Sequence, residues 1–459
     1  MKVSLNAEDI EQKTSQSFIN DVSPYTDDKS PRKDTTSKAD EKSGISAIQY
    51  SINIMKMCAG NGALAVPYAM QACGIIPGVI LYIIFAYSYY HGSEILIRLK
   101  TCFDTSKVHS YSNLRSNSEY VKITFNLLGN GGYYLILFCI LITLWGINVG
   151  TMIIMTNLLQ NLPWESMGIH ASETSLRITI SIILMFIMFF FVSLNNTKQL
   201  SVISSFGLLT LFISFVILLI RGGIDYGLSS DLPLWPTSFS AMISNMGTLL
   251  YTLCFCFVIY PLYNDMKPTS KKNVNTATAV SLTLITIMYV VVCTVLMLMF
   301  KQDPEGLKDN VLLNLKSGSA ESIIVSILMV ITCGGNYPLL LLGIYEITEY
   351  SMPASDPKRF FIQGNKRYLS RYIQVLCITI VSILVPYFGV ILNFIGSFTS
   401  TLAGQILPAI LYLTYIKKSK LKVTTWEKVF NYIFICIFSV IMVTCTVLSL
   451  IDLVKSIGF

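Results

Sequence analysis

The residues most able to bind a small molecule lie in an apolar stretch that begins near residue 45. Its middle contains Gly60, Asn61, Gly62 and Ala63 in succession. Glycine costs about 1 kcal/mol relative to alanine inside a helix, so a helix is weak at this point. A break would free backbone N–H groups at the start of the resumed helix, and such groups attract a carboxylate. The alternative is that these small residues allow close helix packing without any ligand.

A lysine lies one turn before these glycines. Lys56 is the only formal charge between Lys42 and Glu94. Its separation from Lys42 corresponds to roughly 21 Å along a helix. A lysine at the centre of a bilayer costs at least ~2.5–3.5 kcal/mol and normally faces a polar interior, which indicates a functional role. The alternative is that the span starts later and Lys56 reaches the membrane interface.

The sequence contains few residues that could bind a metal or catalyse a reaction. The chain has three histidines, far apart, and eleven cysteines without a C-x-x-C pair. Zinc-ligand spacing is therefore missing, and we expect no metal and no cofactor. An intramembrane hydrolase is disfavoured because the sequence lacks an H-E-x-x-H motif, paired membrane aspartates and a Ser/His arrangement. We expect that the protein is not an enzyme.

The composition indicates the elements that must position these residues. Hydrophobic residues make up 53% of the 459 residues and charged residues only 13%, about half the charged share of a soluble domain. A soluble enzyme and a disulfide-rich secreted domain are excluded, and a polytopic helical membrane protein remains. Residues 1–43 differ, with seven basic and nine acidic residues among many serines and threonines. This composition predicts a disordered tail before a transmembrane domain at 44–456.

Long apolar runs predict eleven transmembrane helices. They lie near 45–71, 74–97, 131–159, 177–194, 199–220, 239–263, 274–300, 322–349, 371–386, 389–416 and 428–452. Most reach the ~20 residues that a helix needs to cross the hydrocarbon. No segment shows the alternation that a β-barrel requires.

The distribution of lysine and arginine predicts the orientation. With the tail placed inside, the loops on its side of the membrane hold nineteen basic residues and the opposite loops hold three. This asymmetry follows the positive-inside rule and predicts a cytoplasmic N-terminus. The net charge of +7 then reflects the basic residues of the cytoplasmic loops, and nucleic acid is not expected as a partner.

Four motifs, in order along the chain, resemble those of the amino acid/auxin permease family, within the amino acid–polyamine–organocation superfamily. They are Gly60-x-Gly62-x-x-x-x-Pro67-Tyr68-Ala69, the run Pro261–Lys267, Asn336-Tyr337-Pro338-Leu339, and Gly396-Ser397 followed by Leu407-Pro408-Ala409. The resemblance extends over residues 45–455. It implies a LeuT-type fold in which two inverted repeats of five helices are followed by one more helix. The first and sixth helices would be broken at the membrane midplane, with substrate between the breaks.

The resemblance also assigns roles to residues. The backbone of Gly60, Asn61, Gly62 and Ala63 would meet the α-carboxylate of an amino acid. Carbonyls of Cys254, Phe255 and Cys256 would meet its ammonium group, and their side chains would form a wall that favours a neutral substrate. Where the sixth span of relatives often carries histidine or glutamate, this chain has the thiols. Lys56, Thr332 and Asn336 would lie at the cation site of coupled relatives, where a fixed ammonium could replace a metal cation.

These observations predict a secondary active or facilitated transporter of free, neutral amino acids that works by alternating access. Coupling to protons, or no coupling, is favoured over sodium. The alternative is an amino-acid sensor of the same fold that signals through its N-terminal tail. The expected partners are the amino acid, membrane lipid and protons. Both the plasma membrane and a vacuolar or lysosomal membrane fit the sequence.

Overall fold

The computed structural model describes residues 44–103, 114, 116, 118–193, 207–348, 365–385 and 387–456, all in the unit Gly44–Phe459. The predicted disordered tail at 1–43 and much of the predicted cytoplasmic loops lie outside these residues. Apart from an isolated parallel bridge between Ile45 and Met266, regular structure in the described residues is helical. The predicted all-α membrane fold is confirmed.

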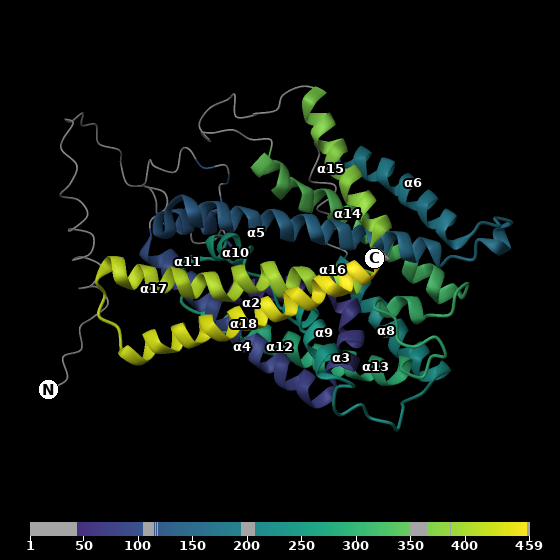
Figure 1. Ribbon diagram of the computed structural model, residues 1–459, viewed down its shortest axis with the longest axis horizontal. Helices are drawn as coiled ribbons and strands as arrows, with labels where there is room; N and C mark the ends of the chain where they lie inside the picture. The colour runs from purple at the N-terminus through teal and green to yellow at the C-terminus, as the bar shows by residue number, and fades with distance from the viewer. Residues whose placement is uncertain are drawn as a thin grey trace. The chain divides into compact units, whose positions relative to one another are not determined.

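Figure 1 shows how the helices are arranged in space. The α-helices are α2 (Ala47–Cys58), α3 (Val66–Cys73), α4 (Ile75–Cys102), α5 (Glu119–Gln160), α6 (Glu173–Ser193), α8 (Gly207–Asp225), α9 (Phe239–Thr252), α10 (Ile259–Asn264), α11 (Pro268–Lys271), α12 (Val274–Met288), α13 (Thr294–Phe300), α14 (Ala320–Thr348), α15 (Asn365–Leu384), α16 (Phe388–Ile395), α17 (Leu407–Ser419) and α18 (Thr425–Ser456). The 3₁₀ segments are η2 (Asn61–Ala65), η4 (Glu165–Met167) and η6 (Val311–Asn314). The π segments are η5 (Tyr289–Cys293), η7 (Gly396–Ser400) and η8 (Leu402–Ile406).

Eight helices in the described part of the chain are long and apolar enough to cross a membrane. The three other predicted spans, at 45–71, 199–220 and 239–263, are shorter or interrupted there. The first divides into α2, η2 and α3, and the sixth into α9 and α10. The predicted breaks in the first and sixth helices are therefore confirmed, whereas the total of eleven spans stays a prediction.

Local sequence sets the ends of the first helical segments. Ser46 caps α2, because its side chain accepts from the Gln49 N–H while its own N–H donates to the Gln49 side chain. This reciprocal pair satisfies two N–H groups that the helix leaves free. Gly74 separates α3 from α4 with a φ of +77°. A Cβ there would lie 2.5 Å from the carbonyl carbon of Trp235, so only glycine fits.

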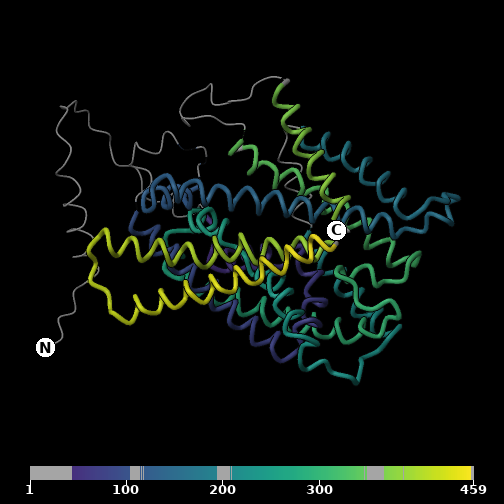
Figure 2. Tube along the Cα trace, in the orientation of Figure 1, coloured from purple at the N-terminus to yellow at the C-terminus, as the bar shows by residue number. Residues whose placement is uncertain are grey.

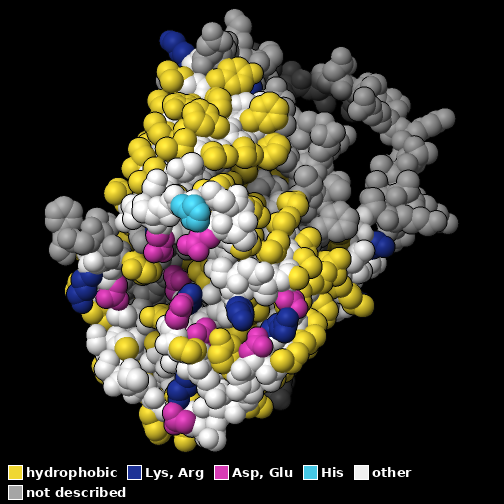
Figure 3. All heavy atoms as spheres, turned by 90° about the vertical axis from the view of Figure 1, so that its right-hand side faces the viewer, with side chains coloured by type: hydrophobic (Ala, Val, Ile, Leu, Met, Phe, Trp, Pro, Cys, Tyr) yellow, Lys and Arg dark blue, Asp and Glu magenta, His cyan; other side chains and the backbone are white. Residues whose placement is uncertain are grey.

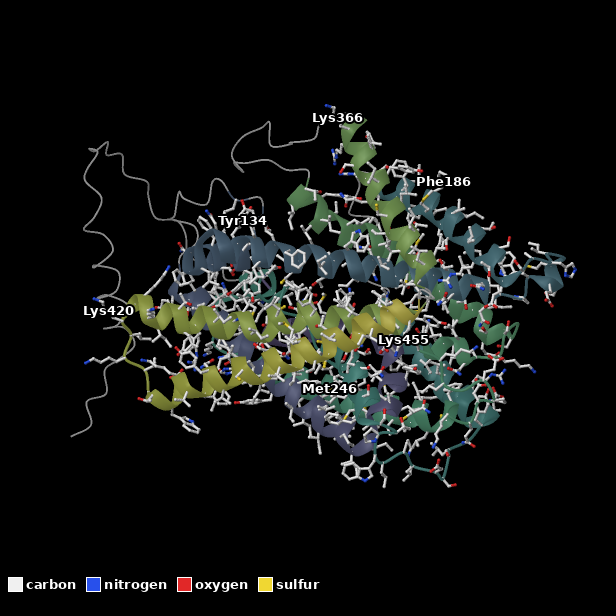
Figure 4. All side chains as sticks on the ribbon, viewed as in Figure 1. Tyr134, Phe186, Met246, Lys366, Lys420 and Lys455 are labelled. Atoms are coloured by element: carbon white, nitrogen blue, oxygen red, sulfur yellow. The ribbon has the colours of Figure 1, made fainter. Side chains whose placement is uncertain are left out.

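The broken helices lie inside the bundle. Helix α9 packs against α3, α16, α18 and η7, while α2 packs against α12. Helices α17 and α18 lie side by side (Figure 2). On the outside, Tyr134 of α5 and Phe186 of α6 are 67% and 56% exposed and point away from the bundle (Figure 4). Such exposed apolar side chains fit contact with lipid hydrocarbon.

Candidate functional site

The break in the first helix is formed by its glycine-containing segment. Helix α2 closes with a hydrogen bond from the Ala59 N–H to the Met55 carbonyl at 2.7 Å. Gly60 is then extended, with φ −83° and ψ −165°, and the Ala63 N–H donates to its carbonyl at 3.0 Å. The N–H groups of Asn61 and Gly62 stand at the start of the resumed helix, where no intrahelical acceptor is available. N–H groups at the start of a helix are able to bind an anion.

Gly62 brings this segment close to the end of α9. A Cβ on Gly62 would lie 2.6 and 2.8 Å from ring carbons of Tyr251 and 3.3 Å from the Thr252 methyl group. Gly60 is less crowded, with only the Met57 carbonyl oxygen within 4 Å of such an atom, at 3.5 Å. Gly62 therefore does allow close helix packing, the alternative explanation for these glycines, and this packing occurs directly beside the break.

The break in the sixth helix has no glycine. The Cys254 N–H donates to the Tyr251 carbonyl at 3.1 Å, which ends α9 in a tight turn. The Val258 N–H donates to the Phe255 carbonyl at 3.1 Å before α10 begins. Within the turn the thiols of Cys254 and Cys256 are 3.7 Å apart. Phe255 and Cys256 are buried and Cys254 is half-buried.

Tyrosines from neighbouring helices bind to both breaks. The Tyr289 hydroxyl, in the π segment η5, donates to the Cys58 carbonyl at 2.6 Å, at the end of α2. The Tyr82 hydroxyl of α4 lies 3.3 Å from that of Thr252, at the end of α9. The two tyrosine rings stack with centroids 5.7 Å apart. The sequence analysis did not predict this pair. The one indication in the sequence is that tyrosines, which are aromatic and polar, occur within apolar runs.

The proposed coupling residues are placed on two sides of the first break. Lys56 lies half-buried in the last turn of α2. The Thr332 hydroxyl of α14 donates to Thr210 of α8 at 3.2 Å, and Gly207 packs against Thr332 near Asn336. The residue of the broken segment that bonds to α14 is Asn61, whose amide nitrogen lies 3.5 Å from the Cys333 sulfur. A role of Lys56 together with Thr332 and Asn336 therefore stays a prediction.

A cavity of about 1020 Å³ opens at one end of the bundle. Its wall is built from the C-terminal end of α5, the region of η4, the start of α6, residues 307–317, Tyr68 of α3 and Tyr387. Figure 3 shows this end, where acidic and basic side chains gather between apolar flanks. The Asp309 carboxylate in the wall accepts a hydrogen bond from the Gly389 N–H at 2.9 Å. Burial raises the pKa of this carboxyl, although backbone N–H groups oppose the shift.

At the other end, the chain before α2 bonds to the loop after α10. The Ile45 N–H donates to the Asp265 carbonyl at 2.8 Å, and the Lys267 N–H donates to the Ile45 carbonyl at 3.0 Å. Gly44, with a φ of +129°, allows this close approach. The two broken helices are thus joined at the end away from the cavity.

Comparisons with known proteins agree with this architecture. The family model described as "Transmembrane amino acid transporter protein" matches residues 43–451. The chain is 24% identical to Amino acid transporter AVT3B of Arabidopsis thaliana, over 80% of this chain and 84% of that protein. It is 22% identical to Vacuolar amino acid transporter 7 of Saccharomyces cerevisiae, over 54% and 48% respectively. It is 24% identical to Sodium-coupled neutral amino acid transporter 4 of Homo sapiens, over 50% and 42%.

Proposed function

The chain belongs to the family of transmembrane amino acid transporter proteins, and from this premise we propose that it moves free neutral amino acids across a membrane by alternating access. Transport is secondary active with proton coupling, or facilitated, rather than sodium-coupled. The observation that carries the proposal is the pair of helix breaks packed together, one presenting N–H groups and the other presenting carbonyls and side chains.

The first break holds the substrate carboxylate. The N–H groups near Asn61 and Gly62 begin the resumed helix, so they combine free donors with the positive end of the helix dipole. Gly60 and Ala63 complete this backbone segment. In a site sheltered from water, a carboxylate that accepts two such hydrogen bonds is bound more strongly than a neutral group.

The second break holds the ammonium group and the side chain. The carbonyls of Cys254, Phe255 and Cys256 lie in the turn between α9 and α10. The Phe255 carbonyl already accepts from the Val258 N–H and binds the ammonium through its second lone pair. Thiols and an aromatic ring form a wall without formal charge, and burying a charged side chain against it without a partner would be costly. This supports neutral substrates.

The coupling proposal depends on Lys56. Lys56 lies in the last turn of α2, and the helix dipole stabilises a cation near the C-terminal end of a helix. A fixed ammonium at this place makes a bound sodium ion unnecessary. One relative is called sodium-coupled and others carry no ion in their names, so coupling must be measured on this chain.

We place the protein in the plasma membrane or in a vacuolar or lysosomal membrane, with its N-terminus in the cytoplasm. The asymmetry of basic residues supports this orientation. The cavity then faces the outside of the cell or the organelle lumen, and the bridge between Ile45 and Met266 lies on the cytoplasmic side.

A sensor is the second candidate, and one observation favours it. Ile45, which lies two residues after the N-terminal tail, exchanges hydrogen bonds with Asp265 and Lys267 in the loop after the sixth helix. A conformational change at that helix would therefore alter the chain next to the tail. Deleting residues 1–43 separates the candidates. A transporter keeps its uptake after the deletion, whereas a sensor loses signalling while its amino acid binding is unchanged.

The deciding experiment is uptake by the purified full chain in proteoliposomes. A panel of labelled amino acids is tested at two pH values, with and without sodium. We expect saturable uptake of neutral amino acids that does not require sodium. Binding without flux would favour the sensor, and uptake that strictly requires sodium would overturn the coupling proposal.

A further inference from the structure

Two buried hydroxyl groups near the sixth-helix break lack ordinary hydrogen-bond partners. Tyr89 of α4 is 1% exposed and Ser400 of η7 is fully buried. Neither hydroxyl has a hydrogen-bond partner of normal geometry among the described residues. A buried polar group left unsatisfied destabilises a protein appreciably, so a pair of them in one place calls for an explanation.

Both hydroxyls lie beside the break, because the Cys254 thiol is within weak hydrogen-bonding reach of each of them, and the Cys256 thiol lies 3.7 Å from the Cys254 thiol. A thiol is a weak donor and a weak acceptor, so it satisfies neither hydroxyl well. The Tyr89 hydroxyl also lies within electrostatic range of Cys58, the last residue of α2. Both groups therefore lie at the sixth-helix break, where the side chain of the substrate is proposed to bind.

The surrounding backbone holds these groups in place. The Tyr89 ring is packed so closely on Gly404 that a Cβ there would lie 2.5 Å from a ring carbon. Its neighbour Ser88 accepts a hydrogen bond from the Gln405 side chain at 2.7 Å. Ser400 ends one π segment and η8 follows almost at once. Such π segments are often found at functional sites, since they redirect side chains within a helix.

We propose that Tyr89 and Ser400 form a side-chain subsite that selects neutral amino acids carrying a hydroxyl or amide group. This proposal rests on the proposed function and narrows its substrate class. A hydroxyl can both donate and accept, so a substrate hydroxyl or amide satisfies both groups. The nearest electrostatic partners of Tyr89 are thiols rather than ions, which disfavours acidic and basic side chains. An apolar side chain would leave both hydroxyls with only the weak contact to the Cys254 thiol.

The test compares substrates of nearly equal shape. Threonine and valine differ by a hydroxyl in place of a methyl group, and asparagine and leucine by an amide in place of a branched alkyl group. Each competes for uptake of labelled alanine by the full chain in proteoliposomes. We expect threonine to compete at least about tenfold better than valine, as one buried hydrogen bond implies. The Tyr89→Phe and Ser400→Ala variants should lower this ratio several-fold while keeping competition by valine.

The matched control is Tyr82→Phe. Tyr82 is also buried on α4, but its hydroxyl is already paired with Thr252, so its loss should leave the threonine-to-valine ratio unchanged. Alanine uptake with equal competition by threonine and valine would overturn the subsite and leave the proposed function standing. An equal fall of the ratio in Tyr82→Phe and Tyr89→Phe would also overturn it, because the effect would then be structural. Failure of the unmutated protein to bind or take up any amino acid would overturn the proposed function itself.

Discussion

The two helix breaks have similar positions but different causes. The first is encoded locally, because Gly60 adopts an extended backbone and Gly62 allows contact with Tyr251. The sixth contains no glycine and depends on its surroundings. Upstream of it, Gly247 packs directly on the backbone of Asn393, whose side chain accepts from the Thr248 N–H at 3.1 Å. The first break therefore offers main-chain N–H groups to a ligand. The sixth offers carbonyls and side chains, and it follows a helix, α9, that packs against α16 of the tenth span.

This contrast predicts that filling the first break has the largest effect. A valine at position 62 would overlap the Tyr251 ring, and overpacking of this kind costs typically 1–3 kcal/mol. We expect Gly62→Val to reduce uptake by at least about 100-fold, since the displaced segment carries the carboxylate donors. The measurement is initial uptake per amount of inserted protein.

The control is Gly131→Val on α5, where a Cβ would meet no atom within 4 Å. Normal uptake by Gly131→Val shows that a valine in an apolar helix is tolerated. Normal uptake by Gly62→Val would contradict the assignment of the first break.

The difference between the breaks also explains how much could be predicted. Gly60, Gly62 and Lys56 stand out in the sequence because glycine and lysine are unfavourable inside a membrane helix. Cys254 and Cys256 do not stand out, since cysteine is common in apolar cores, and only the family resemblance indicated a break there. The contribution of Tyr289 and Tyr82 depends on contacts between residues about 200 positions apart, which no local pattern contains.

The second prediction tests which break holds the carboxylate. If the main chain of the first break binds it, an amine of the same side chain but without the carboxylate should compete about 100-fold less well. Each buried N–H left unpaired costs about 1–3 kcal/mol, and two are involved. Competition against labelled substrate gives the ratio. Amines that compete as well as amino acids would contradict a carboxylate site at Asn61 and Gly62.

The third prediction concerns Lys56, which lies in the last turn of α2 just before the first break. We expect Lys56→Ala to lower uptake about tenfold, because the cation at the end of α2 is gone. Lys56→Arg keeps the charge but replaces a compact ammonium by a planar guanidinium, so it should impair uptake more than a conservative change normally does. Uptake is measured between pH 5 and 8 in sodium-free buffer, a range chosen as roughly physiological.

Lys366→Ala is the matched control, because Lys366 is exposed at the start of α15 (Figure 4). It should leave uptake unchanged. Normal uptake by Lys56→Ala, or uptake by the unmutated protein that strictly needs sodium, would contradict the role of Lys56.

We expect the smallest effect from removing the Asn61 side chain, the polar side chain of the first break. Among the residues that the structure describes, the Asn61 amide donates to the Cys333 sulfur at 3.5 Å, and a thiol is a weak acceptor. Asn61→Ala keeps the backbone N–H that the carboxylate needs, so uptake should change by less than about threefold, the equivalent of a weak hydrogen bond. Cys254→Ala, at the other break, should instead alter the order of preference among neutral amino acids, because there the side chains form the wall. A large loss of uptake in Asn61→Ala, with unchanged selectivity in Cys254→Ala, would contradict both assignments. The first break would then bind substrate through a side chain, and the side chain at the sixth break would not select it.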